Sequence, residues 1–175
     1  MGMLSRFRTA YRERRAVRWT VDLLVMLVVV VAISAWQTRK HLRDVPLPAL
    51  QLRSVSGESV SLQSLRGKKT LLYLWAPWCG VCKVESPNVG HVRSLLGDRV
   101  NVVSVVAAYQ SVDEVRRYVS DKGVEYPVLL GDDSIERAFK VNAFPTVYFI
   151  DEQGRIKGSA TGYTTTIGLI ARLYL

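Results

Sequence analysis

The spacing of apolar and polar residues changes several times along the chain and predicts short strands separated by helices. Residues 70–75 form a continuous apolar run of strand length, and residues 101–107 form a second run rich in valine. Residues 50–55 and 59–62 alternate between apolar and polar positions around Ser56-Gly57-Glu58, the pattern of a hairpin with a tight turn. Further short strands are predicted at residues 127–130, 146–150 and 155–160.

Helical spacing occupies the stretches between these strands. The longest predicted helix covers residues 79–96 and is followed by Gly97, a residue that commonly ends helices. A second helix at 111–122 begins with Ser111 as its cap and Glu114 at the capping-box position. Strands that alternate with helices indicate an α/β fold with a central mixed sheet flanked by helices. Shorter helices are predicted at 62–65, 132–140 and 164–173. The apolar residues that recur at helical spacing in the helix at 79–96 are Val81, Val84, Val89, Val92, Leu95 and Leu96.

A longer apolar segment precedes this folded part. Residues 23–36 are almost entirely apolar, and together with residues 17–22 they reach the roughly 20 residues that a helix needs to cross hydrocarbon. Trp19 and Trp36 bracket the run, as interfacial aromatic anchors do. We predict a membrane anchor. The alternative is a cleaved secretory signal, because residues 32–35 are small enough for a signal peptidase.

Basic residues are concentrated around this segment. Residues 1–43 hold nine of the 24 basic and two of the 15 acidic residues, which gives them a net charge of +7 and leaves +2 for the rest. A nearly neutral folded part argues against a nucleic-acid-binding protein. Arginines outnumber other charges before the apolar run, so the positive-inside bias places the N-terminus in the cytoplasm. The predicted organisation is a cytoplasmic basic leader (1–18), a single-pass transmembrane anchor in the inner membrane (19–37), a tether (38–48) and a periplasmic domain (49–175).

The two cysteines of the chain lie together, directly after the apolar run 70–75, in the segment Trp78-Cys79-Gly80-Val81-Cys82-Lys83. At the N-terminus of a helix, free amide groups and the helix dipole lower the pKa of Cys79 from about 8.5 towards 7. Cys82 lies one turn further on the same face and can attack a mixed disulfide formed on Cys79. The spacing therefore predicts a redox-active disulfide with Cys79 as nucleophile and Cys82 as resolving thiol.

Other chemistries were weighed for this pair. The two cysteines alone are too few for a four-ligand zinc site, and only His41 and His91 could supplement them. Haem attachment needs a histidine at the position of Lys83. Copper binding by the two thiolates stays open as an alternative. A third alternative is a non-catalytic binding module.

Several of these residues resemble the thioredoxin superfamily. Residues 74–83 look like its active-site segment, and Pro87 matches the proline of its active-site helix. Phe144-Pro145-Thr146 is similar to the segment that holds the family's cis-proline. The hairpin around Gly57 is typical of the membrane-anchored TlpA/ResA-like branch, with DsbE/ScsD-like proteins the most similar in pattern. The resemblance covers roughly residues 46–175.

This resemblance implies a thioredoxin fold with an N-terminal hairpin and a thiol:disulfide oxidoreductase without metal or cofactor. Its implied partners are protein thiol/disulfide substrates and an integral-membrane electron donor. Because Gly80-Val81 supplies no histidine to stabilise a thiolate, we expect a reductase, with oxidase or isomerase as the alternative. The implied substrate-binding residues are Trp78, Phe144 and Pro145, and the implied supporting residues are Gly80, Val81 and Pro87.

The chain departs from thioredoxin at one position. Tyr73 occupies the place of the buried aspartate that accepts the proton of the resolving thiol in thioredoxin. Glu85, one turn past Cys82, could substitute for it, but we expect an exposed glutamate on the helix surface. Trp75 is expected in the core, Trp78 at the active-site surface, and His91 on the surface without a role.

Overall fold

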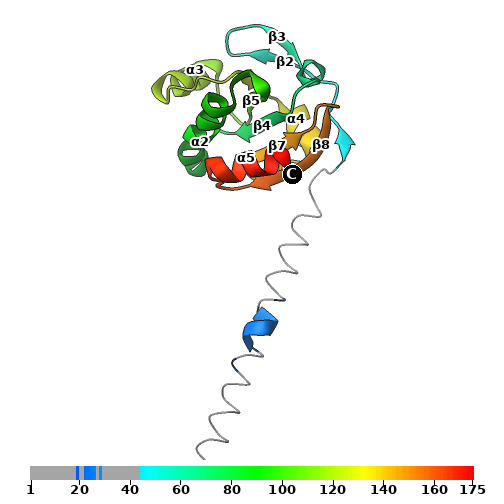
Figure 1. The fold of residues 1–175 in the computed structure, drawn as a ribbon. Helices are drawn as coiled ribbons and strands as arrows, with labels where there is room; N and C mark the ends of the chain where they lie inside the picture. The colour runs from blue at the N-terminus through cyan, green and yellow to red at the C-terminus, as the bar shows by residue number, and fades with distance from the viewer. Residues whose placement is uncertain (1–18, 20–21, 27, 29–43) are drawn as a thin grey trace, which may run out of the picture. The chain divides into compact units, whose positions relative to one another are not determined.

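The computed structural model describes residues 19, 22–26, 28 and 44–175 (Figure 1). The chain divides into two units, Met1–His41 and Leu42–Leu175. In the first unit the described residues are helical, and no helix among the residues described anywhere in the chain has the length and apolar character needed to span a bilayer. The predicted leader, most of the predicted anchor and residues 38–43 of the predicted tether lie outside the described residues.

The second unit is built on one mixed sheet of eight strands in the order β1-β8-β7-β4-β5-β6-β2-β3. Strands β4, β5 and β6 are parallel, and β7 runs antiparallel beside β4. The strands are β1 (Val45–Pro46), β2 (Gln51–Ser54), β3 (Ser59–Ser61), β4 (Thr70–Trp75), β5 (Asn101–Val106), β6 (Val128–Leu130), β7 (Thr146–Ile150) and β8 (Arg155–Thr161). The helices are η1 (Leu62–Leu65), α2 (Gly80–Leu96), η2 (Gly97–Arg99), α3 (Val112–Asp121), α4 (Asp133–Phe139) and α5 (Thr166–Tyr174).

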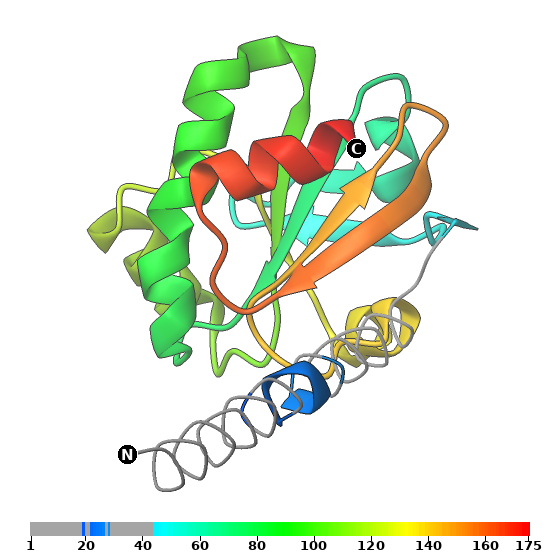
Figure 2. The same cartoon turned by 60° about the horizontal axis from the view of Figure 1, so that its bottom comes forward.

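Helices cover both faces of this sheet (Figures 1 and 2). Successive residues of β4 point to opposite faces, so that Tyr73 packs in the core under α2, α3 and α5, whereas Leu72 packs in the core under η1 and α4. All six residues of β4 are buried. This confirms the predicted α/β sandwich and the predicted buried strand, which ends at Trp75, four residues before Cys79.

The N-terminal edge of the sheet differs from the prediction. Residues 44–48 were assigned to the tether, but Val45–Pro46 forms strand β1, which pairs with β8, and Leu47 is 3% exposed. Asp44 adds ion pairs to Arg155 at 3.0 Å and to Lys157 at 3.3 Å. The extended conformation was predicted correctly from the prolines, and a proline is tolerated in an edge strand. Burial of one leucine and pairing with a strand more than 100 residues away joined this segment to the domain.

Candidate active site

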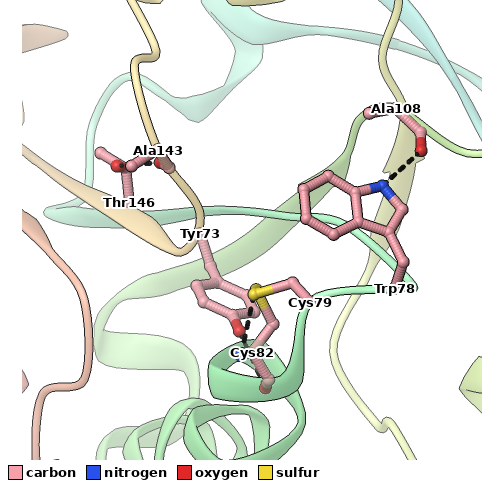
Figure 3. Close-up of a disulfide and its surroundings, with 7 residues drawn as sticks. All are labelled: Tyr73, Trp78, Cys79, Cys82, Ala108, Ala143 and Thr146. Carbon is pink, nitrogen blue, oxygen red and sulfur yellow. Dashed lines mark hydrogen bonds between the residues drawn. A yellow bond between two sulfur atoms is a disulfide. The ribbon is translucent and has the colours of Figure 1, made fainter.

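The two cysteines lie at the junction between β4 and α2 (Figure 3). They form a disulfide, and Cys79 is the N-cap of α2. The backbone N–H of Cys82 donates to Sγ of Cys79 at 3.1 Å. Cys79 is 5% exposed and Cys82 is fully buried. A nucleophile from outside can therefore approach only the sulfur of Cys79, which is also the sulfur that receives the amide hydrogen bond.

Trp78 forms one wall beside this disulfide. The residue is 64% exposed, yet its Nε1 donates to the carbonyl oxygen of Ala108 at 2.9 Å. The ring also meets Phe144 edge to face, with centroids 6.0 Å apart. Two contacts thus hold an exposed aromatic ring in one orientation, and an ordered apolar surface of this kind suits binding of a polypeptide.

The segment after α4 supplies the residues predicted around the cis-proline. The Phe144–Pro145 peptide bond is cis, as the resemblance implied. Thr146 fixes the segment from one side by donating to the carbonyl oxygen of Ala143 at 2.8 Å, and Gly162 donates to the carbonyl oxygen of Pro145 at 2.9 Å. In the view of Figure 3 the disulfide lies between Trp78 and this segment. The structure therefore places Phe144 against Trp78, the residue next to Cys79 in the chain. The substrate-binding roles of Trp78, Phe144 and Pro145 stay predictions.

Glu85 contradicts its prediction as an exposed surface residue. It is fully buried, and one carboxylate oxygen accepts a hydrogen bond from the backbone N–H of Thr164 at 2.9 Å. The other oxygen, Oε2, has no hydrogen-bond partner among the described residues. Burial raises the pKa of Glu85 to about 7, and the hydrogen bonds from Thr164 offset part of this rise. Glu85 thus places a buried carboxyl group one turn from Cys82, on the opposite side of the helix from the one predicted, and a carboxylate in this environment is chemically able to accept a proton.

The buried face of α2 differs from the face that its apolar residues predict. The buried residues of α2 are Cys82, Glu85, Ser86, Val89 and Val92. Of the apolar positions that predicted this helix, Val81, Val84 and Leu95 are 46%, 63% and 62% exposed. The burial of Glu85 could have been predicted from Cys82. A resolving cysteine is expected to point inward, and residues three or four positions further along a helix share its face.

Buried hydroxyl groups surround the same face of α2. The hydroxyl of Tyr73 donates to the carbonyl oxygen of Cys82 at 3.1 Å, and the hydroxyls of Ser86 and Tyr126 lie 2.7 Å apart. Tyr73 is 1% exposed, so burial raises its pKa far above the usual value. This tyrosine cannot replace the aspartate of thioredoxin as a proton acceptor, but it donates a hydrogen bond to the backbone of Cys82.

For the other residues singled out in the sequence, the structure gives the position and the exposure. Gly80 and Val81 are exposed between the two cysteines, and Pro87 lies inside α2 on its exposed side. Trp75 is 1% exposed, which confirms it as a core residue, and His91 is exposed on α2. Within residues 19, 22–26, 28 and 44–175 no three His, Cys, Asp or Glu side chains are grouped to hold a metal ion.

Replacement of Glu85 by glutamine is expected to flatten the pH dependence of stability between about pH 4.5 and 7. The folded domain keeps the Glu85 proton up to a pKa of about 7, whereas the unfolded chain releases it near 4.5. Wild-type stability therefore falls as the pH rises through this window and is level above it. The free energy of unfolding of Glu85→Gln minus that of wild type should therefore be on the order of 2 kcal/mol larger at pH 8 than at pH 4.5.

Urea unfolding of the oxidised protein at pH 4.5, 6 and 8 measures this difference. Glu152→Gln, which changes an exposed carboxylate, is the matched control and should follow wild type. Parallel pH profiles of Glu85→Gln and wild type would show that Glu85 does not titrate in this window.

Comparisons with known proteins agree with this geometry. The Redoxin family profile matches residues 43–168. The thioredoxin-like protein YneN of Bacillus subtilis is 32% identical over 151 residues, which cover 82% of this chain and 88% of YneN. The thiol-disulfide oxidoreductase ResA of the same organism is 28% identical over 120 residues, 67% of this chain and 66% of ResA. The solved structure of MTB DsbF, in mixed oxidised and reduced forms, superimposes with a TM-score of 0.67 at 28% identity and covers 73% of this chain and 97% of DsbF.

Proposed function

Because this chain belongs to the Redoxin family, as a ResA/DsbE-like thiol:disulfide oxidoreductase of the thioredoxin superfamily, we propose that it is a membrane-tethered reductase of protein disulfides outside the cytoplasm. The observation that carries the proposed mechanism is the unequal placement of the two sulfurs. Cys79 is the N-cap of α2 and is 5% exposed, whereas Cys82 lies in the first turn of α2 and is fully buried. This arrangement assigns attack on the substrate to Cys79 and release of the substrate to Cys82.

The proposed reaction moves two electrons from the dithiol to the substrate. The Cys79 thiolate attacks one sulfur of a protein disulfide, forms a mixed disulfide and expels the other substrate sulfur as a thiolate, which takes up a proton. Cys82 then loses its proton, attacks Sγ of Cys79 and expels the second substrate thiolate. Glu85 accepts the Cys82 proton, since a pKa of about 7 suits proton transfer near neutral pH. The products are a reduced substrate and the Cys79–Cys82 disulfide.

The substrate is proposed to bind as an extended polypeptide across Trp78, Phe144 and Pro145. The fixed ring of Trp78 and its edge contact with Phe144 offer an apolar surface beside the disulfide. The backbone next to Pro145 can pair with an extended chain, as one strand pairs with another. A small disulfide would gain little from this surface. The enzyme should therefore prefer unfolded protein substrates.

Reduction rather than oxidation is proposed because neither residue between the cysteines carries a charge that would stabilise the Cys79 thiolate further. A less stabilised thiolate makes the dithiol a better reductant, nearer to about −270 mV than to about −120 mV. Continued turnover then needs an electron donor. We propose an integral-membrane thiol protein that reduces the Cys79–Cys82 disulfide.

The membrane part of the proposal rests on the sequence. The apolar run and the arginines before it favour a single-pass anchor with the N-terminus in the cytoplasm and the domain in the periplasm. Alkaline carbonate extraction and protease access to the domain in spheroplasts test it. Release of a shortened chain into the soluble fraction would instead indicate a cleaved signal.

An insulin-reduction assay with the full chain in detergent tests the function, with a small aromatic disulfide as the second substrate. We expect turnover of insulin with dithiothreitol as electron source and much slower turnover of the small disulfide. Titration of the reduced protein with Cu(I) belongs beside it. Tight copper binding with negligible insulin reduction would favour a copper-handling protein, and equilibration with glutathione near −120 mV would favour an oxidase.

A further inference from the structure

Tyr73 connects the central strand to the resolving cysteine (Figure 3). Its side chain leaves β4 on the face covered by α2, and its hydroxyl donates to the carbonyl oxygen of Cys82 at 3.1 Å. The backbone N–H of Cys82 in turn donates to Sγ of Cys79 at 3.1 Å. One residue of the first helical turn therefore receives a hydrogen bond from the sheet and directs another at the nucleophilic sulfur.

We propose that Tyr73 is a positioning residue that keeps the amide of Cys82 directed at the sulfur of Cys79 in the reduced enzyme. In the oxidised enzyme the disulfide itself ties the two residues together. Reduction breaks that link, whereas the bond from Tyr73 involves no sulfur and is unaffected by it. The inference rests on the proposed exchange chemistry and names a residue that tunes it.

The surroundings of Tyr73 keep its hydroxyl a donor. A carbonyl oxygen only accepts, so the hydroxyl must supply the proton of this hydrogen bond. Burial raises the pKa of Tyr73, and the nearby ionisable groups of Tyr126, Glu85 and Tyr118 raise it further. These groups come from the loop before β6, from α2 and from α3. None of them offers a positive charge that would ionise Tyr73 at working pH.

The direction in which the pKa of Cys79 should shift depends on which state the hydrogen bond from the Cys82 amide stabilises. A hydrogen bond to Sγ of Cys79 favours the thiolate, and the disulfide has no negative charge to stabilise. Loss of the Tyr73 hydroxyl lets the first turn of α2 move and weakens this bond. The pKa of Cys79 should then rise, the reduced form should become less favourable, and the equilibrium with glutathione should shift towards the disulfide.

Tyr73→Phe tests the proposal because it keeps the ring and removes only the hydroxyl. Tyr148→Phe is the matched control: Tyr148 is also fully buried, on the neighbouring strand β7, but its hydroxyl donates to the carbonyl oxygen of Phe139 on the other face of the sheet. We expect Tyr73→Phe to raise the pKa of Cys79 by about 0.5 to 1 unit, and to shift the glutathione equilibrium about three- to tenfold, or about 15 to 30 mV more negative.

The pH dependence of iodoacetamide alkylation of Cys79 and equilibration in glutathione buffers give the two values. Tyr148→Phe should keep both at wild-type values even though it lowers thermal stability. Equal values in Tyr73→Phe and wild type would overturn the proposal and leave Tyr73 as a core residue. If Tyr73→Phe does not fold, 3-fluorotyrosine introduced at position 73 is a stronger donor and must lower the pKa of Cys79; an unchanged pKa again overturns the proposal.

Failure of the proposed function would be recognised separately. In that case the wild-type cysteine pair would not equilibrate with glutathione at all, or would do so without reducing insulin.

Discussion

Cys79→Ser is expected to abolish disulfide reduction, with a loss of at least about a thousandfold in kcat/KM for insulin. The serine hydroxyl is not ionised at neutral pH and cannot form a mixed disulfide. Cys82 cannot take over the attack, because its side chain, in the first turn of α2, is fully buried. The loss should therefore be nearly complete, although the fold around the N-cap is retained.

Initial rates of insulin reduction by the wild type and by Cys79→Ser, at equal protein concentrations, measure this loss. His91→Ala, an exposed change on the same helix, is the control and should keep wild-type activity. A Cys79→Ser enzyme with more than about a tenth of the wild-type rate would contradict the assignment of the nucleophile.

Phe139→Ala is expected to have the largest effect on stability, a loss of about 3 to 5 kcal/mol in the free energy of unfolding. Phe139 is fully buried at the end of α4, and its ring centroid lies 5.1 Å from that of Tyr148. Removing the ring leaves a cavity in the core under η1 and α4. The free energy of unfolding of a domain of this size is commonly only about 5 to 15 kcal/mol, so the melting temperature should fall by roughly 10 to 20 °C.

Urea unfolding of the oxidised variant at pH 7 measures the change. Ile167→Ala, at a position 80% exposed, removes apolar atoms without opening a cavity and should cost less than about 0.5 kcal/mol. Below its melting temperature Phe139→Ala should still reduce insulin, because Phe139 packs on the face of the sheet opposite the disulfide. Similar unfolding free energies for the two variants would show that the α4 core is not tightly packed.

Most of the fold was predictable because its signals are local. The apolar run at β4 and the helix that follows were read from neighbouring residues, and Ser111 caps α3 through the backbone N–H of Glu114 at 3.2 Å, as predicted. Strand β1 was not predictable in this way. Its two residues are a strand only because they pair with β8, and no short-range pattern encodes that pairing.

In the candidate site, too, the residues that local sequence identifies were predicted, whereas those fixed by long-range contacts were not. Cys79 and Cys82 were identified from a motif with fixed spacing, and Pro145 from the resemblance of Phe144-Pro145-Thr146 to the cis-proline segment of the family. The structure shows a disulfide between the two cysteines and a cis bond before Pro145. Glu85 was assigned to solvent because a glutamate is rarely buried without a charged partner. Its burial depends on the backbone N–H of Thr164, a residue 79 positions away, and the hydrogen bond from Trp78 to Ala108 likewise joins distant residues.

Trapping of the mixed disulfide tests the central claim most directly. Cys82→Ser and Cys79→Ser are each incubated with an unfolded protein whose thiols have been converted to mixed disulfides with a small leaving group. The covalent products are measured by intact mass. We predict that Cys82→Ser accumulates a stable adduct at Cys79 and that Cys79→Ser forms little or none. Equal trapping by both variants, or an adduct on Cys82 alone, would contradict the division of roles between the two sulfurs.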